Sequence, residues 1–274
     1  MSANDRRKLV VIKYGGNAII DPELTRELLS KIVSLHKEGY KIVLVHGGGP
    51  FINQNLELAG INAEFIGGQR KTDSKAMKYI EMALKGEVNG NLVREVNLLG
   101  AKAVGLSGKD GQLAMATKRF HYDEDKNEID IGQVGNVHEI NTDIINILLD
   151  NNYLPIVASI ASSKDGIDYN INADNFAGFL AAALNVYELL MLTDIDGLMM
   201  DPEDKTTIIT ELKTSEIDGL KGSVIKGGMI PKTEACLYAV DNGADRAIIL
   251  NGTKPEVIEA AVKQKKFIGT VITK

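Results

Sequence analysis

The sequence is poor in cysteine and in aromatic residues. Of its 274 residues only Cys236 is a cysteine, tryptophan is absent, and aromatic side chains make up 5%. A single cysteine excludes a disulfide within the chain and is typical of a protein in the reducing cytoplasm. Cys236 lies in a helical pattern and is expected to be a small core residue, and the core as a whole must be aliphatic.

Long apolar runs and an excess of positive charge are missing as well. No segment approaches the roughly 20 apolar residues of a membrane span, and Lys13 makes the first apolar segment too short and too polar for a signal peptide. The formal net charge of −6 disfavours binding to nucleic acid, because contacts with its phosphates need a basic surface. These absences predict a cytoplasmic protein without membrane or nucleic-acid partners, and they leave room for a small anionic ligand.

The chain instead alternates short β-branched runs with segments of helical period. Residues 9–14 and 42–45 are predicted strands, and residues 23–37 and 50–59 are predicted helices. Further strands are expected at 103–106, 113–120, 129–137, 154–158, 188–193, 246–250 and 270–273, and further helices at 77–99 (with a break near Gly86 or Gly90), 141–150, 173–184, 231–241 and 255–263. Residues 63–71 show no helical stripe and contain Gly67 and Gly68, which suggests a hairpin or an irregular lid. This alternation is typical of an α/β fold with a parallel sheet and crossover helices. We place a division into two lobes that share one sheet near Asn172.

Three glycine clusters stand at predicted strand or helix ends, where such folds bind ligands. Residues 13–17 and 46–50 begin at the ends of predicted strands, and residues 226–232 lead into a predicted helix. Glycine there lets the backbone approach a ligand and aim N–H groups at it, although a tight turn alone would also explain one cluster. Two clusters at the ends of neighbouring strands favour an anion site. The common phosphate-binding patterns, GxxxxGK[ST] and GxGxxG after a strand, are absent from the sequence.

Charged residues accompany these clusters in unusual positions. Lys13 lies inside an apolar strand, where a charge is costly unless it is paired or functional; the plain alternative is an edge strand that faces solvent. Lys232 lies at the start of a helix, where a cation opposes the macrodipole, so it is either a phosphate ligand or a solvated surface lysine. Asp174 begins another helix and is either a helix cap or the group that holds both lysines in position.

Six motifs, in order, carry a resemblance to a known family. They are IKYGGNA (12–18), HGGGP (46–50), GLSGKDG (105–111), NINAD (170–174), LTDIDG (192–197) and GGMIPK (227–232). The chain resembles the acetylglutamate kinases of the amino acid kinase family over nearly its whole length. The resemblance implies an open, mostly parallel αβα sandwich. It also implies an N-terminal lobe (1–172) that binds the amino acid and forms a dimer, and a C-terminal lobe (173–274) that binds ATP.

The same resemblance implies an activity and a role for each motif residue. The enzyme would transfer the γ-phosphate of ATP, with Mg²⁺ carried by the nucleotide and no metal held by the protein, to the side-chain carboxylate of N-acetyl-L-glutamate in arginine biosynthesis. The implied catalytic residues are Lys13, Lys232, Asp174, Gly16 and Gly48. The implied substrate-binding residues are Gly47, Gly48, Arg70, Asn170 and Asn172. The implied nucleotide-binding residues are Gly15, Thr193, Asp194, Gly197, Lys226, Gly227, Gly228 and Met229.

The substrate and the assembly stay open. The family usually has apolar residues beside the substrate arginine, whereas Gln69 and Lys71 flank Arg70. The acyl group and the amino acid are therefore not fixed, and a kinase for an aminoadipate derivative is an alternative. A non-catalytic sensor on the same fold is another alternative, although binding alone would not need two lysines and an aspartate together. Few residues precede the first predicted strand, whereas arginine-inhibited members carry a longer N-terminal helix, so a homodimer without arginine feedback is expected.

Replacing either lysine, as Lys13→Ala or Lys232→Ala, is expected to lower kcat by about 10²- to 10³-fold. Each change removes a cation that stabilises charge in the transition state of phosphoryl transfer. The purified variants are compared with the wild type in an ATP-dependent turnover assay, after circular dichroism has shown that they are folded. Near-normal turnover by either folded variant would contradict the assignment.

Overall fold

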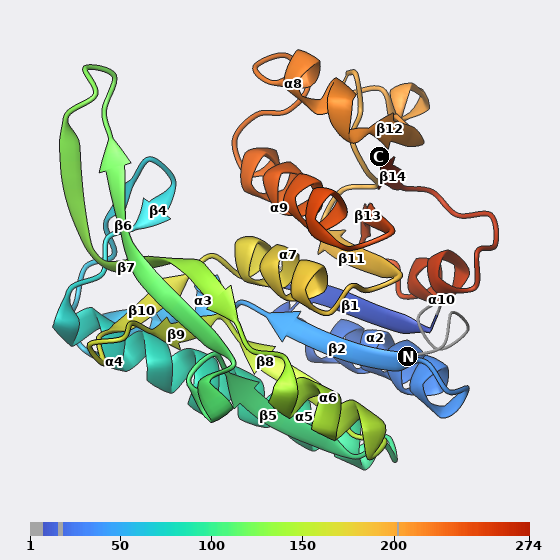
Figure 1. Cartoon of the computed structure of the whole chain (residues 1–274), viewed down its shortest axis with the longest axis horizontal. Helices are drawn as coiled ribbons and strands as arrows, with labels where there is room; N and C mark the ends of the chain where they lie inside the picture. The colour runs from blue at the N-terminus through green and yellow to red at the C-terminus, as the bar shows by residue number, and fades with distance from the viewer. Residues whose placement is uncertain (1–7, 16–18, 202) are drawn as a thin grey trace.

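A computed structural model describes residues 8–15, 19–201 and 203–274. One large sheet lies between two layers of helices (Figure 1). One face is covered by α6 (Asp143–Asp150), α7 (Ala173–Ala183) and α9 (Met229–Asn242), and the other by α2 (Pro22–Lys37), α5 (Asn89–Leu98) and α10 (Glu256–Val262). The expected open αβα sandwich is therefore confirmed. In the described part of the chain no helix is both long enough and apolar enough to cross a membrane.

The sheet has eight strands in the order β12-β14-β13-β11-β1-β2-β8-β5. Their bounds are β12 (Glu211–Lys213), β14 (Thr270–Thr273), β13 (Arg246–Asn251), β11 (Glu188–Thr193), β1 (Leu9–Tyr14), β2 (Lys41–His46), β8 (Leu154–Ala158) and β5 (Ala103–Ser107). Neighbours from β13 to β5 are parallel, and β14 runs antiparallel to β13. The carboxyl ends of the parallel strands therefore meet at one edge, where sheets of this kind bind ligands.

The central strand β1 is buried on both of its faces. Leu9 and Val11 pack in the apolar cluster that includes α7 and α9, whereas Val10 and Ile12 pack in the cluster that includes α2 and α10. Successive side chains of a strand point to opposite faces, so Lys13 falls on the same face as Leu9 and Val11. The strand's near-continuous apolar run is what a strand covered on both sides requires.

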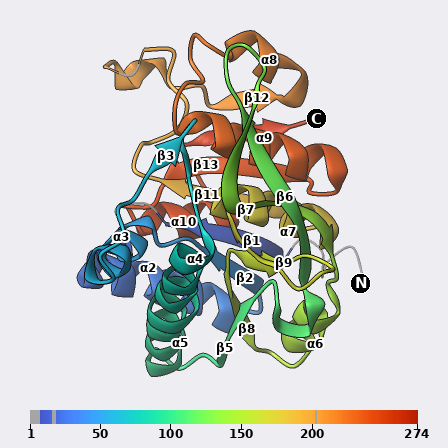
Figure 2. The ribbon, with the colours of Figure 1, turned by 90° about the vertical axis from the view of Figure 1, so that its left-hand side faces the viewer.

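A long hairpin departs from this sheet. β6 (Ala114–Tyr122) and β7 (Glu128–Ile140) are antiparallel, and they close into a small barrel with β9 (Ile160–Ser162) and β10 (Asp168–Ile171). The far end of the hairpin extends away from the central sheet (Figure 1), and Figure 2 shows its two strands side by side. The sequence predicts this pair of strands but not β9 and β10, because each of those is too short to show a period.

A second, smaller hairpin packs against the first. β3 (Phe65–Ile66) and β4 (Gln69–Arg70) are joined by a glycine turn, as the lack of a helical stripe there predicts. The backbone at Gly67 lies against the ring of His121 on β6, and a side chain at that position would overlap the imidazole. The long hairpin therefore supports the strand that carries Arg70.

The segment predicted as one interrupted helix is continuous but changes its winding. α4 (Ser74–Glu81) passes into a π-helical stretch (Met82–Val88), and α5 follows directly. Of the two positions predicted for a break, Gly86 lies in this π-helical stretch and Gly90 lies within α5. π-helical turns recur at functional sites. α3 (Gly49–Leu58) packs against α4 and this stretch. Beyond β11, a short helix α8 (Ile217–Leu220) and the edge strand β12 occupy a region whose sequence is too polar and mixed to assign.

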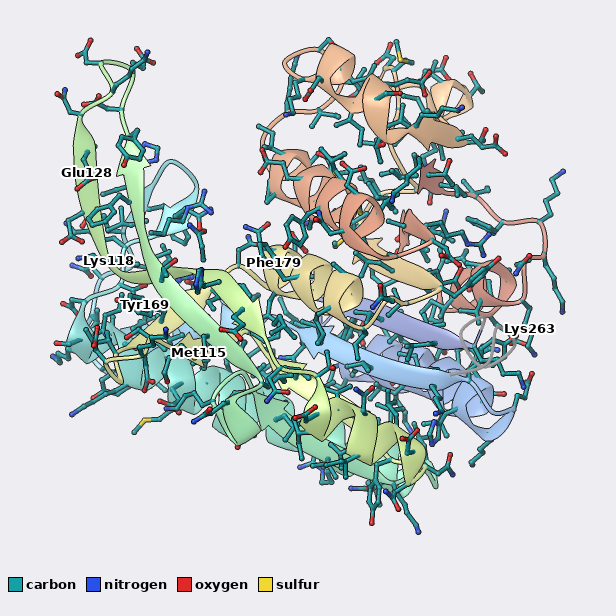
Figure 3. The ribbon with its side chains drawn as sticks, in the orientation of Figure 1. Met115, Lys118, Glu128, Tyr169, Phe179 and Lys263 are labelled. Atoms are coloured by element: carbon teal, nitrogen blue, oxygen red, sulfur yellow. The ribbon has the colours of Figure 1, made fainter. Side chains whose placement is uncertain are left out.

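Helices α7 and α9 approach each other closely over the sheet. Phe179 of α7 (Figure 3) stacks on Tyr238 of α9, with ring centroids 3.9 Å apart. A Cβ atom at Gly178 would lie 2.6 Å from the carbonyl oxygen of Ala235 on α9. Glycine at this position therefore sets the distance between the two helices, and Cys236 beside it is fully buried, as its helical pattern predicts.

The Gly178→Ala substitution is expected to destabilise the fold by about 1–3 kcal/mol, because the added methyl group must push α7 and α9 apart. Gly90→Ala, on the helix α5 with nothing near its Cβ position, is the matched control and should be neutral or stabilising by up to about 1 kcal/mol. Urea unfolding of both variants measures the difference. Equal stability of the two would show that the helices do not touch as described.

Candidate active site

Lys13 is buried near the carboxyl end of the central strand. Its side chain is 7% exposed, and its Nζ atom lies 2.7 Å from Oδ1 of Asp174. Because β1 pairs with β11 on one side and β2 on the other, the alternative of a solvent-facing edge lysine is wrong. A charge in such a place is stable only when it is paired, and the pairing carboxylate comes from the first turn of α7.

Asp174 is held between two ammonium groups. Its other oxygen, Oδ2, accepts a hydrogen bond of 3.0 Å from Nζ of Lys232 in the first turn of α9. The side chain that caps α7 is instead Asn172, whose Oδ1 accepts hydrogen bonds from the N–H groups of Asp174 and Asn175. The capping alternative for Asp174 is therefore wrong, and its carboxylate is free to join β1 to α9.

The charge state of Asp174 follows from two opposing effects. Burial alone would raise the pKa of its carboxyl group, but the charges of Lys13 and Lys232 outweigh burial and hold that pKa below its ordinary value. The group is thus ionised at neutral pH. Its negative charge compensates one of the two lysines, and the cluster as a whole keeps one unit of positive charge for an incoming anion.

A cavity of about 290 Å³ opens beside this cluster. Its described lining is made of Lys13, Gly15, Gly47, Gly48, Gly49, Pro50, Ile52, Leu84, Ser159, Asn170, Ile171, Asn172, Ala173 and Asp174. Most of the catalytic and substrate-binding residues predicted from the sequence thus lie together around one space. Gly16, also predicted, lies outside the described residues.

The glycines after β2 bring the backbone close to other elements around this cavity. A Cβ atom at Gly48 would lie 2.8 Å from the Leu84 side chain of the π-helical stretch. Gly47 donates its N–H to the carbonyl of Tyr14 at the end of β1, so the two glycine turns are tied to each other. Small residues here leave the cavity open between β1, β2 and α7.

Arg70 is buried but does not line this cavity among its described residues. Its Nη2 atom donates a hydrogen bond of 2.6 Å to Asn53 of α3, and its guanidinium lies 4.6 Å from the ring centroid of Phe65. In contrast, Nη1 is buried and has no hydrogen-bond partner among the described residues. A buried cationic donor without a partner is costly, so this nitrogen is suited to an anionic ligand.

Of the residues predicted to bind nucleotide, Gly15 lines the cavity, whereas the others are not part of its described lining. Thr193 ends β11, the neighbour of β1, and its hydroxyl donates to Asp194 over 3.2 Å. The turn that follows is held by Asp196, which accepts hydrogen bonds from Asn251 and Lys254.

The other predicted nucleotide segment, Lys226, Gly227 and Gly228, leads into α9 and Met229 is the first residue of that helix. The sheet and α9 thus place both nucleotide segments on the Lys232 side of the buried cluster.

Two site residues are not evident from the sequence. Ser159 lines the cavity and is almost fully buried between β8 and β9; its place after a buried strand, at the edge that carries the glycine turns, was the available signal. Asn53 holds Arg70 from a different element, and no local pattern reveals it because the contact depends on how α3 meets the β3–β4 hairpin.

Two lysines around one buried carboxylate, beside glycine turns at a parallel sheet edge, form a site whose charge suits a phosphoryl anion. Residues 8–251 match the amino acid kinase family, and the chain belongs to that family, whose kinase activity implies ATP as donor. The fold agrees: a carbamate kinase of Giardia covers 97% of this chain and 99% of its own with a TM-score of 0.71 at 23% identity.

Within the family, the chain is similar to acetylglutamate kinases. The acetylglutamate kinase of Methanococcus aeolicus is 42% identical over 97% of this chain and 92% of its own length. That of Halothermothrix orenii is 44% identical over 97% of this chain and 91% of its own length. The family resemblance inferred from the six sequence motifs is therefore confirmed.

Asp174→Asn is expected to lower the free energy of unfolding by about 3–5 kcal/mol at neutral pH, because the buried Lys13 and the half-buried Lys232 lose their counter-charge. The folded-state pKa of Asp174 lies below its ordinary value of 3.8. Its stabilising effect is therefore complete above that value and is lost as the pH falls through the folded pKa. The gap between wild type and variant should close in acid, as urea titrations from pH 7 to about pH 2 would show.

The matched control is Asp150→Asn, which breaks an exposed pair with Lys41. It should cost less than about 1 kcal/mol at any pH. An Asp174→Asn variant with the same small and pH-independent cost would mean that the buried cluster does not form.

Proposed function

We propose that the protein is an acetylglutamate kinase, which transfers the γ-phosphoryl group of ATP to the side-chain carboxylate of N-acetyl-L-glutamate in arginine biosynthesis. The observation that carries the proposal is the buried arrangement of Lys13, Asp174 and Lys232 beside the cavity. The full-length similarity to acetylglutamate kinases supports the same activity.

The chemistry needs positioning and charge neutralisation rather than a base. A glutamate side chain has a pKa of about 4.3, so at neutral pH its carboxylate is already a nucleophile. One of its oxygens forms the new bond to the γ-phosphorus while the bond from that phosphorus to the oxygen of ADP breaks, which gives an acyl phosphate and ADP. Both partners are anions, and Lys13 and Lys232 would offset their repulsion as charge moves to the leaving group.

Asp174 has a supporting role in this proposal. Its two oxygens hold the two ammonium groups on opposite sides of one carboxylate, so neither lysine has to be ordered when the substrates bind. Preorganised charges of this kind cost no reorganisation at the moment of reaction. We also assign Gly15, Gly16 and Gly48 as N–H donors to the phosphates or to the developing charge.

Substrate recognition is assigned to Arg70 and to the remaining cavity residues. Arg70, through its unpartnered Nη1, would pair with the α-carboxylate, and Gly47, Asn170 and Asn172 would line the amino-acid pocket. Nucleotide binding is assigned to the second lobe (173–274), through Thr193, Asp194, Gly197, Lys226, Gly227, Gly228 and Met229. The first lobe (1–172) would bind the amino acid and provide the dimer contact.

Magnesium enters the proposal as the ion bound to the ATP phosphates. The donor set fits this, because Asp174, the carboxylate among the described cavity residues, is already engaged by two lysines. The ion would neutralise phosphate charge, as it does in other enzymes that use ATP. We further propose a homodimer in the cytoplasm; the free and buried Cys236 suits that reducing compartment.

A substrate panel tests the activity. Wild-type protein, ATP and Mg²⁺ are incubated with N-acetylglutamate, glutamate, N-acetylaspartate and N-acetyl-2-aminoadipate, and hydroxylamine traps any acyl phosphate as a coloured hydroxamate. We expect N-acetylglutamate to give the highest kcat/KM. A higher kcat/KM for the aminoadipate derivative would make that compound the substrate in place of N-acetylglutamate. If no acyl amino acid gives a hydroxamate, the protein would instead be a non-catalytic sensor on the same fold.

Two variants at neighbouring positions test the recognition of the amino acid, with Arg70→Ala as the test and Lys71→Ala as its control. Arg70→Ala should raise KM for the amino acid by about 10²-fold, since truncating one side of a buried charge pair typically costs 2–5 kcal/mol, roughly 30-fold or more. Lys71→Ala removes a half-exposed neighbour that pairs with Glu64 and should change KM by less than about threefold.

A further inference from the structure

His46, the last residue of β2, is fully buried directly before the glycines of the cavity. Its Nδ1 atom lies 2.9 Å from the carbonyl oxygen of Gly47, the next residue. Its Nε2 atom lies 2.9 Å from Nδ2 of Asn89 at the start of α5. Both ring nitrogens are therefore engaged, and the ring is not available as a base for the reaction.

The partners of Asn89 decide which ring nitrogen carries the proton. Nδ2 of Asn89 also lies 2.9 Å from the carbonyl oxygen of Ile156 on β8, to which it donates. An amide nitrogen is a donor only, so Nε2 of His46 must accept from it. The proton of the neutral ring is then on Nδ1, which donates to the Gly47 carbonyl. Burial keeps the ring neutral by lowering the pKa of His46 to about 4.

This hydrogen bond fixes the orientation of one peptide group. The described peptide bonds are trans, and in a trans peptide the C=O and the following N–H point in opposite directions. The Gly47 carbonyl is drawn to the buried ring, so the N–H of Gly48 points the other way. Gly48 lines the cavity, and its N–H makes no hydrogen bond to any residue that the structure describes. Gly47, in contrast, has already given its N–H to Tyr14.

The partner that holds the ring, Asn89, is itself closely packed. Asn89 is 2% exposed, and it packs so closely on the backbone of Gly105 in β5 that any side chain there would overlap its amide oxygen. Leu84 and Val88 of the π-helical stretch lie close to Gly48, at 2.8 Å and 3.1 Å from where its Cβ atom would be. This accounts for the first glycine of the GLSGKDG motif, which otherwise has no role at the site.

We propose that His46 is a positioning residue that aims the Gly48 N–H into the cavity, toward the oxygen on which charge develops during phosphoryl transfer, and that Asn89 and Gly105 hold its ring for that purpose. The inference rests on the proposed function for the nature of that oxygen. The orientation of the peptide itself does not depend on the function.

Two variants, each of which replaces one ring nitrogen of His46 by an amide atom, separate the positioning of the Gly47–Gly48 peptide from the packing of the side chain. In His46→Asn, the side-chain nitrogen takes the place of Nδ1 and can still donate to the Gly47 carbonyl. In His46→Gln, the amide oxygen takes the place of Nε2 and accepts from Asn89, but the donor to Gly47 is lost. Each variant leaves one buried polar group without its partner, so both should lose thermal stability by a similar amount.

Their turnover should differ although their stability does not. We expect kcat of His46→Gln to fall by about 10- to 100-fold with KM nearly unchanged, because a donor that acts in the transition state is misdirected. His46→Asn should stay within about threefold of the wild-type kcat. His36→Gln, at another buried histidine on α2, controls for the cost of burying glutamine and should lose stability without losing kcat.

A function-independent measurement accompanies the kinetics. In protein labelled with ¹⁵N-glycine, both variants lose the ring-current effect of His46 on the Gly48 amide resonance, but that resonance should shift or broaden much more in His46→Gln than in His46→Asn. If wild-type protein phosphorylates no member of the substrate panel, the proposed function fails and the resonance alone decides the orientation of the peptide. Equal kcat in the two variants, and a Gly48 resonance shift in His46→Gln no larger than in His46→Asn, would overturn the inference.

Discussion

The buried carboxylate of Asp174 is the constraint on which the site depends. Without it, Lys13 would be an unpaired charge on the central strand, and Lys232 would stand at a helix N-terminus that repels cations. With it, the end of β1 and the first turns of α7 and α9 meet at fixed distances. The same contact therefore anchors two helices to the sheet and presents two ammonium groups to a ligand.

The parallel sheet supplies the rest of the site by bringing strand ends together. β1, β2, β8 and β11 end at one edge, and the residues after them form the cavity and the neighbouring turns. The elements beyond this edge act as supports. Leu84 of the π-helical stretch packs close to Gly48, and the long hairpin packs against the small β3–β4 hairpin that carries Arg70. Rigid support of this kind suits a reaction that needs positioned charges and no proton transfer.

Much of the fold can be predicted from the sequence, because helix and strand periods are local. The strand at residues 9–14 and the helix at 23–37 agree with β1 and α2 to within one residue. β9 and β10 could not be predicted, since strands of three and four residues take their stability from distant partners. The sequence indicated the π-helical stretch only as a helix break near Gly86 or Gly90, because its winding is imposed by the packing of its neighbours.

For the site, the sequence by itself determined the residue types: glycine turns after two strands, Lys13 in an apolar strand, and Asp174 and Lys232 at helix starts. It could not decide whether Asp174 caps its helix or pairs with the lysines, which lie far from it along the chain. The tertiary structure decided this by giving the cap to Asn172. The contact between His46 and Asn89 was likewise evident only in the tertiary structure. It depends on how the sheet and helices pack, which the local periodicity of the sequence does not show.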